Sequence, residues 1–163
     1  MADVVEPNET EQEDTQKGKF LTFALNDEFY GIEIKHVTEI IGIQQIVELP
    51  ELPVYFRGII NLRGKIIPVM DVRLRFNKEF REYNERTCII VIDIKEVSMG
   101  LIVDSVSEVI SIPEDDIVPP PEVSKQSNRY IYGIGKVGHE VKLLLDCEKL
   151  LYDDVAEHIL GIL

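Results

Sequence analysis

Hydrophobic and polar residues alternate with a period of two from Phe20 onward, and this period is typical of β-strands. Residues 21–25 alternate in this way, and residues 88–94 form a nearly continuous β-branched run that suits a strand buried on both faces. Helical patterns are sparse, and the clearest covers residues 153–163, where an aspartate can cap the helix. We therefore expect an all-β fold with short helical elements, including a C-terminal helix.

Two stretches of the chain repeat one pattern. Residues 30–43 align with residues 99–112 at an offset of 69, and further along, at an offset of 75, Gly58-Ile59 matches Gly133-Ile134. Chance similarity between two β-rich segments would match their hydrophobic residues but would not explain the matched glycines and glutamates. We therefore favour an internal duplication. Recurrence of a glycine at 58 and 133 indicates a requirement of backbone geometry. The residues that recur at the first offset are Gly31/Gly100, Val37/Val106, Glu39/Glu108, Ile41/Ile110 and Ile43/Ile112.

The duplication predicts how the chain is divided. Residues 1–17 are acidic and contain no aromatic residue, which predicts a disordered tail. Residues 18–86 and 87–152 each offer about five short strands joined by tight turns, and such small units usually close into barrels that hide their edges. We expect two barrel subdomains, followed by the helix at 153–163.

Composition narrows the class of protein. The chain has 163 residues, 45% of them hydrophobic, and a net charge of −13. A core is therefore possible, whereas nucleic-acid binding, which rests on basic residues, is disfavoured. No apolar run approaches the roughly 20 residues of a membrane helix. Cys88 and Cys147 lie in apolar runs and indicate buried thiols in a reducing compartment. These features favour a soluble cytoplasmic protein.

The sequence offers little catalytic chemistry. Residues 133–138 match the GxGxxG pattern, but an alternating run follows where a nucleotide site needs a helix, so we interpret the match as accidental. His36, His139 and His158 are far apart, and there is no CxxC, which predicts no metal site. GxSxG and Walker patterns are absent, and no pair of carboxylates stands out. We expect neither an enzyme nor a cofactor.

Two charged residues are not explained by the strand pattern. Glu39 lies on a face otherwise formed by Val37, Ile41 and Ile43, where a carboxylate must reach the rim, pair with a base or meet a partner. Arg63, at the predicted tip of a hairpin, is a candidate partner for a carboxylate. An internal pair between these two residues and recognition of another molecule are both consistent with the sequence.

Two motifs stand out in the first repeat: YGIEIKHVTEI at residues 30–40 and RGIINLRGKIIPVMD at residues 57–71. They resemble motifs of the CheW-type chemotaxis coupling proteins, and the similarity covers residues 18–152. The resemblance implies two SH3-like five-stranded barrels around a shared hydrophobic core and no catalysis. It also implies a scaffold that couples the histidine kinase CheA to the cytoplasmic tips of methyl-accepting chemoreceptors, in arrays beneath the inner membrane.

The resemblance also implies particular sites and partners. Positions in the family that meet the receptor correspond to Val37, Glu39, Ile46 and Arg63, and a region of kinase or ring contact corresponds to the loop that includes Val118 and Val123. Positions implicated in signalling or coupling correspond to Ile89 and Val109, whose patterns indicate burial. The two recurring glycines, Gly58 and Gly133, are expected to be structural or coupling residues. The implied partners are the regulatory domain of the kinase, the receptor tip and further CheW copies. Alternatives are an adaptor of a non-chemotaxis kinase array and a β-barrel that binds a small molecule.

Overall fold

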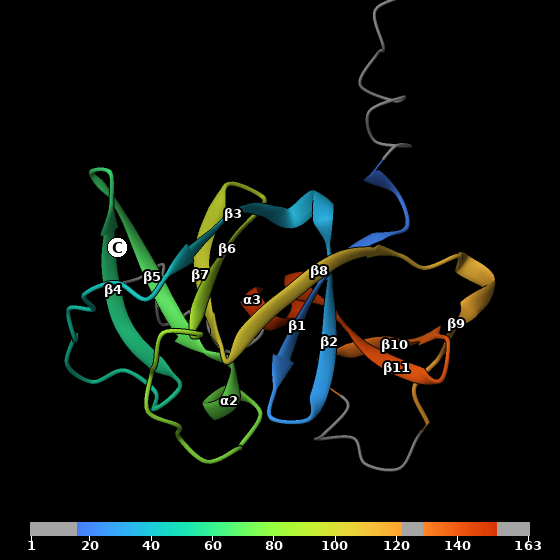
Figure 1. The fold of residues 1–163 in the computed structure, drawn as a ribbon. Helices are drawn as coiled ribbons and strands as arrows, with labels where there is room; N and C mark the ends of the chain where they lie inside the picture. Colours follow the sequence, from blue (N-terminus) through green and yellow to red (C-terminus); the bar gives the residue numbers. More distant parts are fainter. Residues whose placement is uncertain (1–15, 122–128, 153–163) are drawn as a thin grey trace, which may run out of the picture.

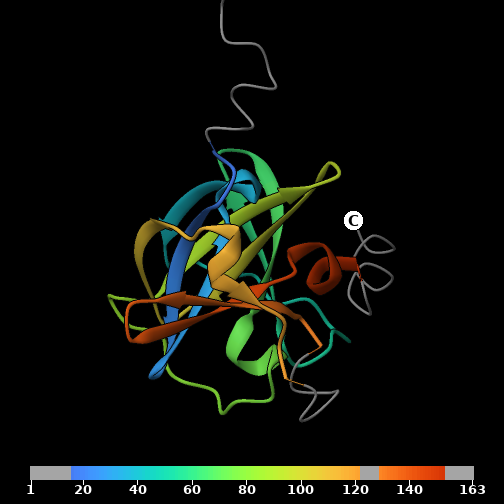
Figure 2. The ribbon, with the colours of Figure 1, turned by 90° about the vertical axis from the view of Figure 1, so that its right-hand side faces the viewer.

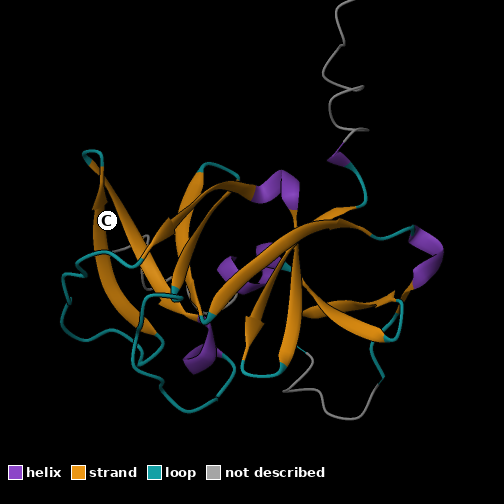
Figure 3. Ribbon diagram, viewed as in Figure 1, coloured by secondary structure: helices purple, strands orange, loops and turns teal. Residues whose placement is uncertain are grey.

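The computed structural model describes residues 16–121 and 129–152, and their strands form two sheets that lie side by side (Figure 1). Strands and loops dominate, and the helices are short, as the alternating pattern predicts (Figure 3). Three predictions fall wholly or mainly outside the described residues: the tail at 1–17, the position of Val123 and the helix at 153–163.

The first sheet has five strands in the order β3-β6-β7-β5-β4. The chain that leaves β3 at one edge returns to β4 at the other, where Val47 and Ile59 exchange two backbone hydrogen bonds of 2.9 Å. This bridge links the two edges, and we call the unit the five-stranded barrel. Its strands are β3 (Val37–Gly42), β4 (Phe56–Leu62), β5 (Lys65–Asp71), β6 (Cys88–Ile94) and β7 (Val97–Val103).

The second sheet has six strands in the order β8-β1-β2-β11-β10-β9. After β8 the chain passes through a 3-10 turn, η2 (Glu114–Asp116), to β9, where Val118 pairs with Ile134 of β10. The two-residue strand β9 adds one strand to the five expected, and we call this unit the six-stranded barrel. Its strands are β1 (Lys19–Leu25), β2 (Glu28–Glu33), β8 (Ser105–Ser111), β9 (Ile117–Val118), β10 (Ile131–Val137) and β11 (Glu140–Leu145).

The two repeats exchange their first hairpins. The five-stranded barrel contains β6 and β7 from the second repeat, and the six-stranded barrel contains β1 and β2 from the first. The exchanged hairpins pair in equivalent registers, since Gly31 aligns with Leu144 and Gly100 with Val69. The expected division into 18–86 and 87–152 therefore marks sequence repeats, each of which supplies strands to both barrels.

One hydrophobic core spans the two barrels. Fully buried side chains from β1 and β2 pack in the same cluster as side chains from β6 and β7. Full burial of each such side chain contributes about 1.5–3 kcal/mol. The exchange of hairpins thus places both repeats around shared apolar contacts. The largest members include Leu21, Phe23, Leu25, Ile32, Ile90, Ile92, Met99 and Leu101.

A short helix follows the last strand of each repeat. α2 (Val72–Arg75) follows β5 and α3 (Cys147–Tyr152) follows β11, and a turn, η1 (Ile34–His36), precedes β3. Asp71 and Asp146 occupy corresponding positions in the two repeats, and each caps the helix that follows it. The side chain of Asp71 accepts a 3.3 Å hydrogen bond from the backbone N–H of Leu74, and that of Asp146 accepts a 2.9 Å bond from the backbone N–H of Lys149. Figure 2 shows α3 as a red helix beside the strands. No helix of the described ranges is long and apolar enough to span a membrane.

Candidate functional site

The β3 edge of the five-stranded barrel carries an exposed ion pair. Arg63 occupies the tip of the β4–β5 hairpin with a φ of 51°, and its Nη2 donates a hydrogen bond to Oε2 of Glu39 on β3. The Arg63 side chain is 70% exposed and that of Glu39 is 30% exposed. Exposed pairs contribute about 0–1 kcal/mol to stability. The structure thus contains the internal pair, in a position that another molecule can reach.

Apolar side chains lie around this ion pair. Ile41, Ile46 and Leu62 are half-buried and pack against the interior of the five-stranded barrel, while Val37 is half-buried against the shared core. The predicted receptor-binding residues therefore belong to one barrel, and Glu39 and Arg63 are in direct contact. The interior residues beneath them are Ile60, Ile67, Val69, Ile89, Val91 and Ile102.

The segment 40–47 extends the apolar surface. Ile40 is 43% exposed, Ile43 is 36% exposed and Val47 is 54% exposed. None of its eight residues is charged, although the chain as a whole carries a net charge of −13. The strand pattern and the family motifs did not single out these exposed residues, and the uncharged stretch is the signal that could have found them. We call this segment, together with Val37, Glu39, Leu62 and Arg63, the β3 surface.

Gly58 lies where the segment after β3 crosses β4. Its φ is +137°, and a Cβ atom there would lie 2.1 Å from the carbonyl oxygen of Val47. Only glycine fits both the backbone conformation and the close approach. A Cβ atom at Gly133 would lie 2.8 Å from Cγ2 of Ile117. At both positions the lack of a side chain thus allows the segment that closes the barrel to pass close to the strand.

The remaining predicted site residues do not belong to the β3 surface, although Ile89 pairs with Ile41 beneath it. Ile89 is fully buried on β6, so a substitution there acts through the core. Val109 is 50% exposed, contrary to the burial that we expected, because β8 is an edge strand of its sheet. Val118 is half-buried in β9. Both valines lie in the six-stranded barrel.

A buried arginine, to which no sequence pattern assigned a role, joins the two barrels. Nη1 of Arg73, on α2, donates hydrogen bonds of 2.7 Å to Oδ2 of Asp104 and 2.9 Å to Oδ1 of Asn26 in the β1–β2 turn. Its Nε donates to the carbonyl oxygen of Glu79 at 3.0 Å. Asn26 belongs to the six-stranded barrel and Asp104 lies between β7 and β8. Arg73 therefore connects α2 to two distant parts of the chain, the β1–β2 turn and the junction of β7 and β8.

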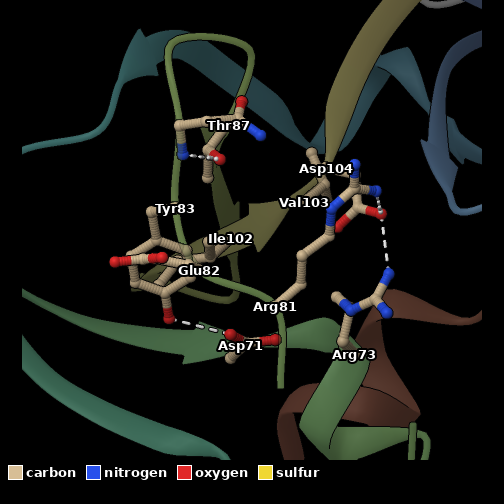
Figure 4. Close-up of a pocket in the computed structure, with 10 residues that line it drawn as sticks. Asp71, Arg73, Arg81, Glu82, Tyr83, Thr87, Ile102, Val103 and Asp104 are labelled. Carbon is tan, nitrogen blue, oxygen red and sulfur yellow. Dashed lines mark hydrogen bonds and ion pairs between the residues drawn. The ribbon is translucent and has the colours of Figure 1, made fainter. Parts of the chain in front are cut away.

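A second buried contact holds the loop between α2 and β6 (Figure 4). The hydroxyl of Tyr83 donates a 2.8 Å hydrogen bond to Oδ2 of Asp71, while Arg81 lies 3.3 Å from Asp104. Burial, and then the hydrogen bond to the Asp71 carboxylate, raise the pKa of Tyr83 above its ordinary value. These contacts fix a loop, and within residues 16–121 and 129–152 no cluster suited to a metal ion is found.

The GxGxxG match forms a β-hairpin. Gly133 and Gly135 lie in β10, Gly138 occupies the turn with a φ of 62°, and β11 follows. A dinucleotide site needs a helix after the glycines. The geometry agrees with the interpretation of this match as accidental.

Known proteins are similar to this chain in sequence and in fold. The family model for the CheW-like domain matches residues 19–155. The chain is 38% identical over 134 residues to a chemotaxis protein CheW of Klebsiella aerogenes, covering 82% of this chain and 81% of that protein. It is 33% identical over 146 residues to a chemotaxis protein CheW of Helicobacter pylori, covering 89% and 88%. The crystal structure of the scaffolding protein TtCheW from Thermoanaerobacter tengcongensis matches with a TM-score of 0.78 and 38% identity, covering 85% of this chain and 94% of that one.

These similarities agree with the motifs at residues 30–40 and 57–71, and they extend across both barrels. The family model covers most of the chain, and the relatives align over four fifths or more of their own length. The chain therefore belongs to the CheW family of chemotaxis coupling proteins.

Proposed function

We propose that this protein is a non-enzymatic cytoplasmic scaffold that couples a CheA-type histidine kinase to the cytoplasmic tips of methyl-accepting chemoreceptors. Family membership supports the role in chemotaxis, and the solved relative is named a scaffolding protein. The observation that carries the receptor site is the exposed pair of Glu39 and Arg63 above half-buried apolar side chains.

The β3 surface suits a helical partner. Grooves with apolar walls and charged rims bind amphipathic helices, and a receptor tip is a hairpin of two helices. In this proposal Val37 and Ile46 contribute apolar contact, whereas Glu39 and Arg63 provide the charges. A few such residues usually carry most of the binding energy of an interface.

The six-stranded barrel offers positions for the kinase. Val109 is exposed on the edge strand β8, and Val118 lies on the short edge strand β9. We assign contacts with the regulatory domain of the kinase, or with further copies of this chain, to the region of Val118 and Val123. Ile89, which is buried, would affect coupling only through the packing of the barrel.

The substitution Glu39→Lys tests the receptor site. It replaces the ion pair with two like charges while leaving the core untouched, so we expect a folded protein that loses the receptor tip fragment in a pull-down and still retains the kinase regulatory domain. The control is Glu108→Lys, which makes the same charge change at the corresponding exposed position of the other repeat. Normal receptor binding by Glu39→Lys would refute the assignment, as would its unfolding.

A further inference from the structure

Equivalent isoleucines of the two repeats differ in exposure. Ile43 directly follows β3, and Ile112, 69 positions later, directly follows the corresponding strand β8. Ile112 is only 2% exposed, whereas Ile43 is 36% exposed. Both lie where the chain leaves an edge strand to cross to the other edge of its barrel. One barrel thus buries this residue and the other presents it.

A single position explains the difference. In the six-stranded barrel Ile112 packs over Gly135, where an added Cβ atom would lie 2.7 Å from its Cδ1. The corresponding position of the five-stranded barrel is Ile60, which is 1% exposed within the interior cluster. Protein interiors have no room for two side chains in one place. Because Ile60 fills the space that Gly135 leaves open, Ile43 stays outside.

Further contacts hold Ile112 inside. Its backbone N–H donates a 2.9 Å hydrogen bond to the carbonyl oxygen of Gly18, and its side chain forms a buried cluster with Phe20 and Leu144. The six-stranded barrel therefore closes its opening with its own isoleucine. In the five-stranded barrel the same residue joins the exposed Ile40 on the uncharged segment 40–47.

We infer that Ile43 is an anchor residue of the β3 surface, presented to the receptor because Ile60 occupies its place in the barrel. This inference rests on the proposed function. The complementary partner is an apolar side chain on a receptor helix with a carboxylate nearby. Arg63 binds that carboxylate, since its pair with Glu39 uses one of five N–H donors and its side chain is 70% exposed.

The test compares two isoleucines of similar exposure. Titration of a receptor tip fragment, followed by calorimetry, should show Ile43→Ser binding about tenfold more weakly than the wild type, equivalent to about 1.4 kcal/mol. Ile66→Ser, at a position 46% exposed on β5 and outside the β3 surface, should bind like the wild type. Circular dichroism of both variants checks the fold.

The outcomes separate this inference from the function on which it rests. If Glu39→Lys abolishes binding while Ile43→Ser binds like the wild type, the function stands and the inference is refuted. An equal loss in Ile66→Ser also refutes it, because the effect is then not specific to the β3 surface. If the wild-type protein binds no receptor fragment, both are refuted.

A second measurement tests the packing cause without any partner. Gly135→Ala places a methyl group against the flexible end of Ile112, so the Ile112 methyl signals should become more sensitive to a soluble paramagnetic agent. Ile60→Ala empties the space that Ile60 fills, so Ile43 should move inward. Its methyl signals should then become less sensitive to the same paramagnetic agent. Unchanged sensitivity of both residues would overturn the explanation.

Discussion

Replacing Arg73 with methionine should destabilise the protein strongly, because it removes one member of a buried ionic group. The ion pair with Asp104 spans 2.7 Å, and the two side chains are only 9% and 14% exposed. Methionine keeps the apolar stem and removes the charge and the donors. The carboxylate of Asp104 then stays buried without its main partner.

The contacts that remain set the magnitude. Removing one partner of a buried ion pair typically costs about 3–5 kcal/mol. Asp104 still accepts a 2.8 Å hydrogen bond from the backbone N–H of Asn26 and lies 3.3 Å from Arg81, so its charge stays partly compensated. The cost should therefore fall near the lower limit, about 3 kcal/mol. With a urea m-value of about 2 kcal/mol/M, the unfolding midpoint falls by about 1.5 M.

Urea unfolding followed by circular dichroism measures this change, and the second repeat supplies a matched control. Glu148 corresponds to Arg73 and pairs with Lys95, which corresponds to Asn26 in the turn of the exchanged hairpin. That pair lies in solvent, so Glu148→Gln should leave the midpoint unchanged. If the free energy of unfolding falls by less than about 1 kcal/mol for Arg73→Met, or by the same amount for both variants, burial is not what makes the contacts of Arg73 stabilising.

Three further predictions concern other positions. Gly58→Ala places a Cβ atom 2.1 Å from the carbonyl oxygen of Val47, so its melting temperature should fall well below that of the wild type. A hydrogen bond from Tyr30 lowers the pKa of Glu28 in the folded protein. The ionised Glu28 carboxylate therefore stabilises the fold above about pH 4.3, the ordinary glutamate value, and this stabilisation is lost as the pH falls through the lower pKa of the folded state. Acid unfolding curves should thus show a shallower pH dependence below that value for Tyr30→Phe than for the wild type, and identical curves would contradict this. Burial raises the pKa of Cys147 to about 12, so a thiol reagent at pH 8 should leave it unmodified until urea unfolds the protein.

Sequence patterns predicted the strands well, because alternation directly reflects which face of a strand is buried. They did not predict the exchange of hairpins, since residues 19–33 and 88–103 have similar patterns and either hairpin suits either barrel. The observed helix α3 begins at Cys147, ahead of the predicted range, because Asp146 caps it as Asp71 caps α2. The correspondence of these aspartates was already visible in the repeat.

The site was predicted unevenly, for physical reasons. The contact of Glu39 with Arg63 could be anticipated because each charge was out of place in its own local pattern. The role of Arg73 could not, since its partners come from turns that only the tertiary fold brings together. Val109 was expected to be buried because alternation shows that two faces differ without showing which one meets solvent.

The exchange of hairpins has a consequence for synthesis on the ribosome. The hairpin of β1 and β2 emerges first, yet its neighbours β8 and β11 are made about 80 and 110 residues later. Both of its edges must therefore remain unpaired while most of the chain is translated. Exposed strand edges and apolar faces favour aggregation, so a nascent or truncated chain that ends near residue 86 is the form most in need of chaperones. Completion of β11, rather than of the first repeat, supplies the last strand that pairs with this hairpin.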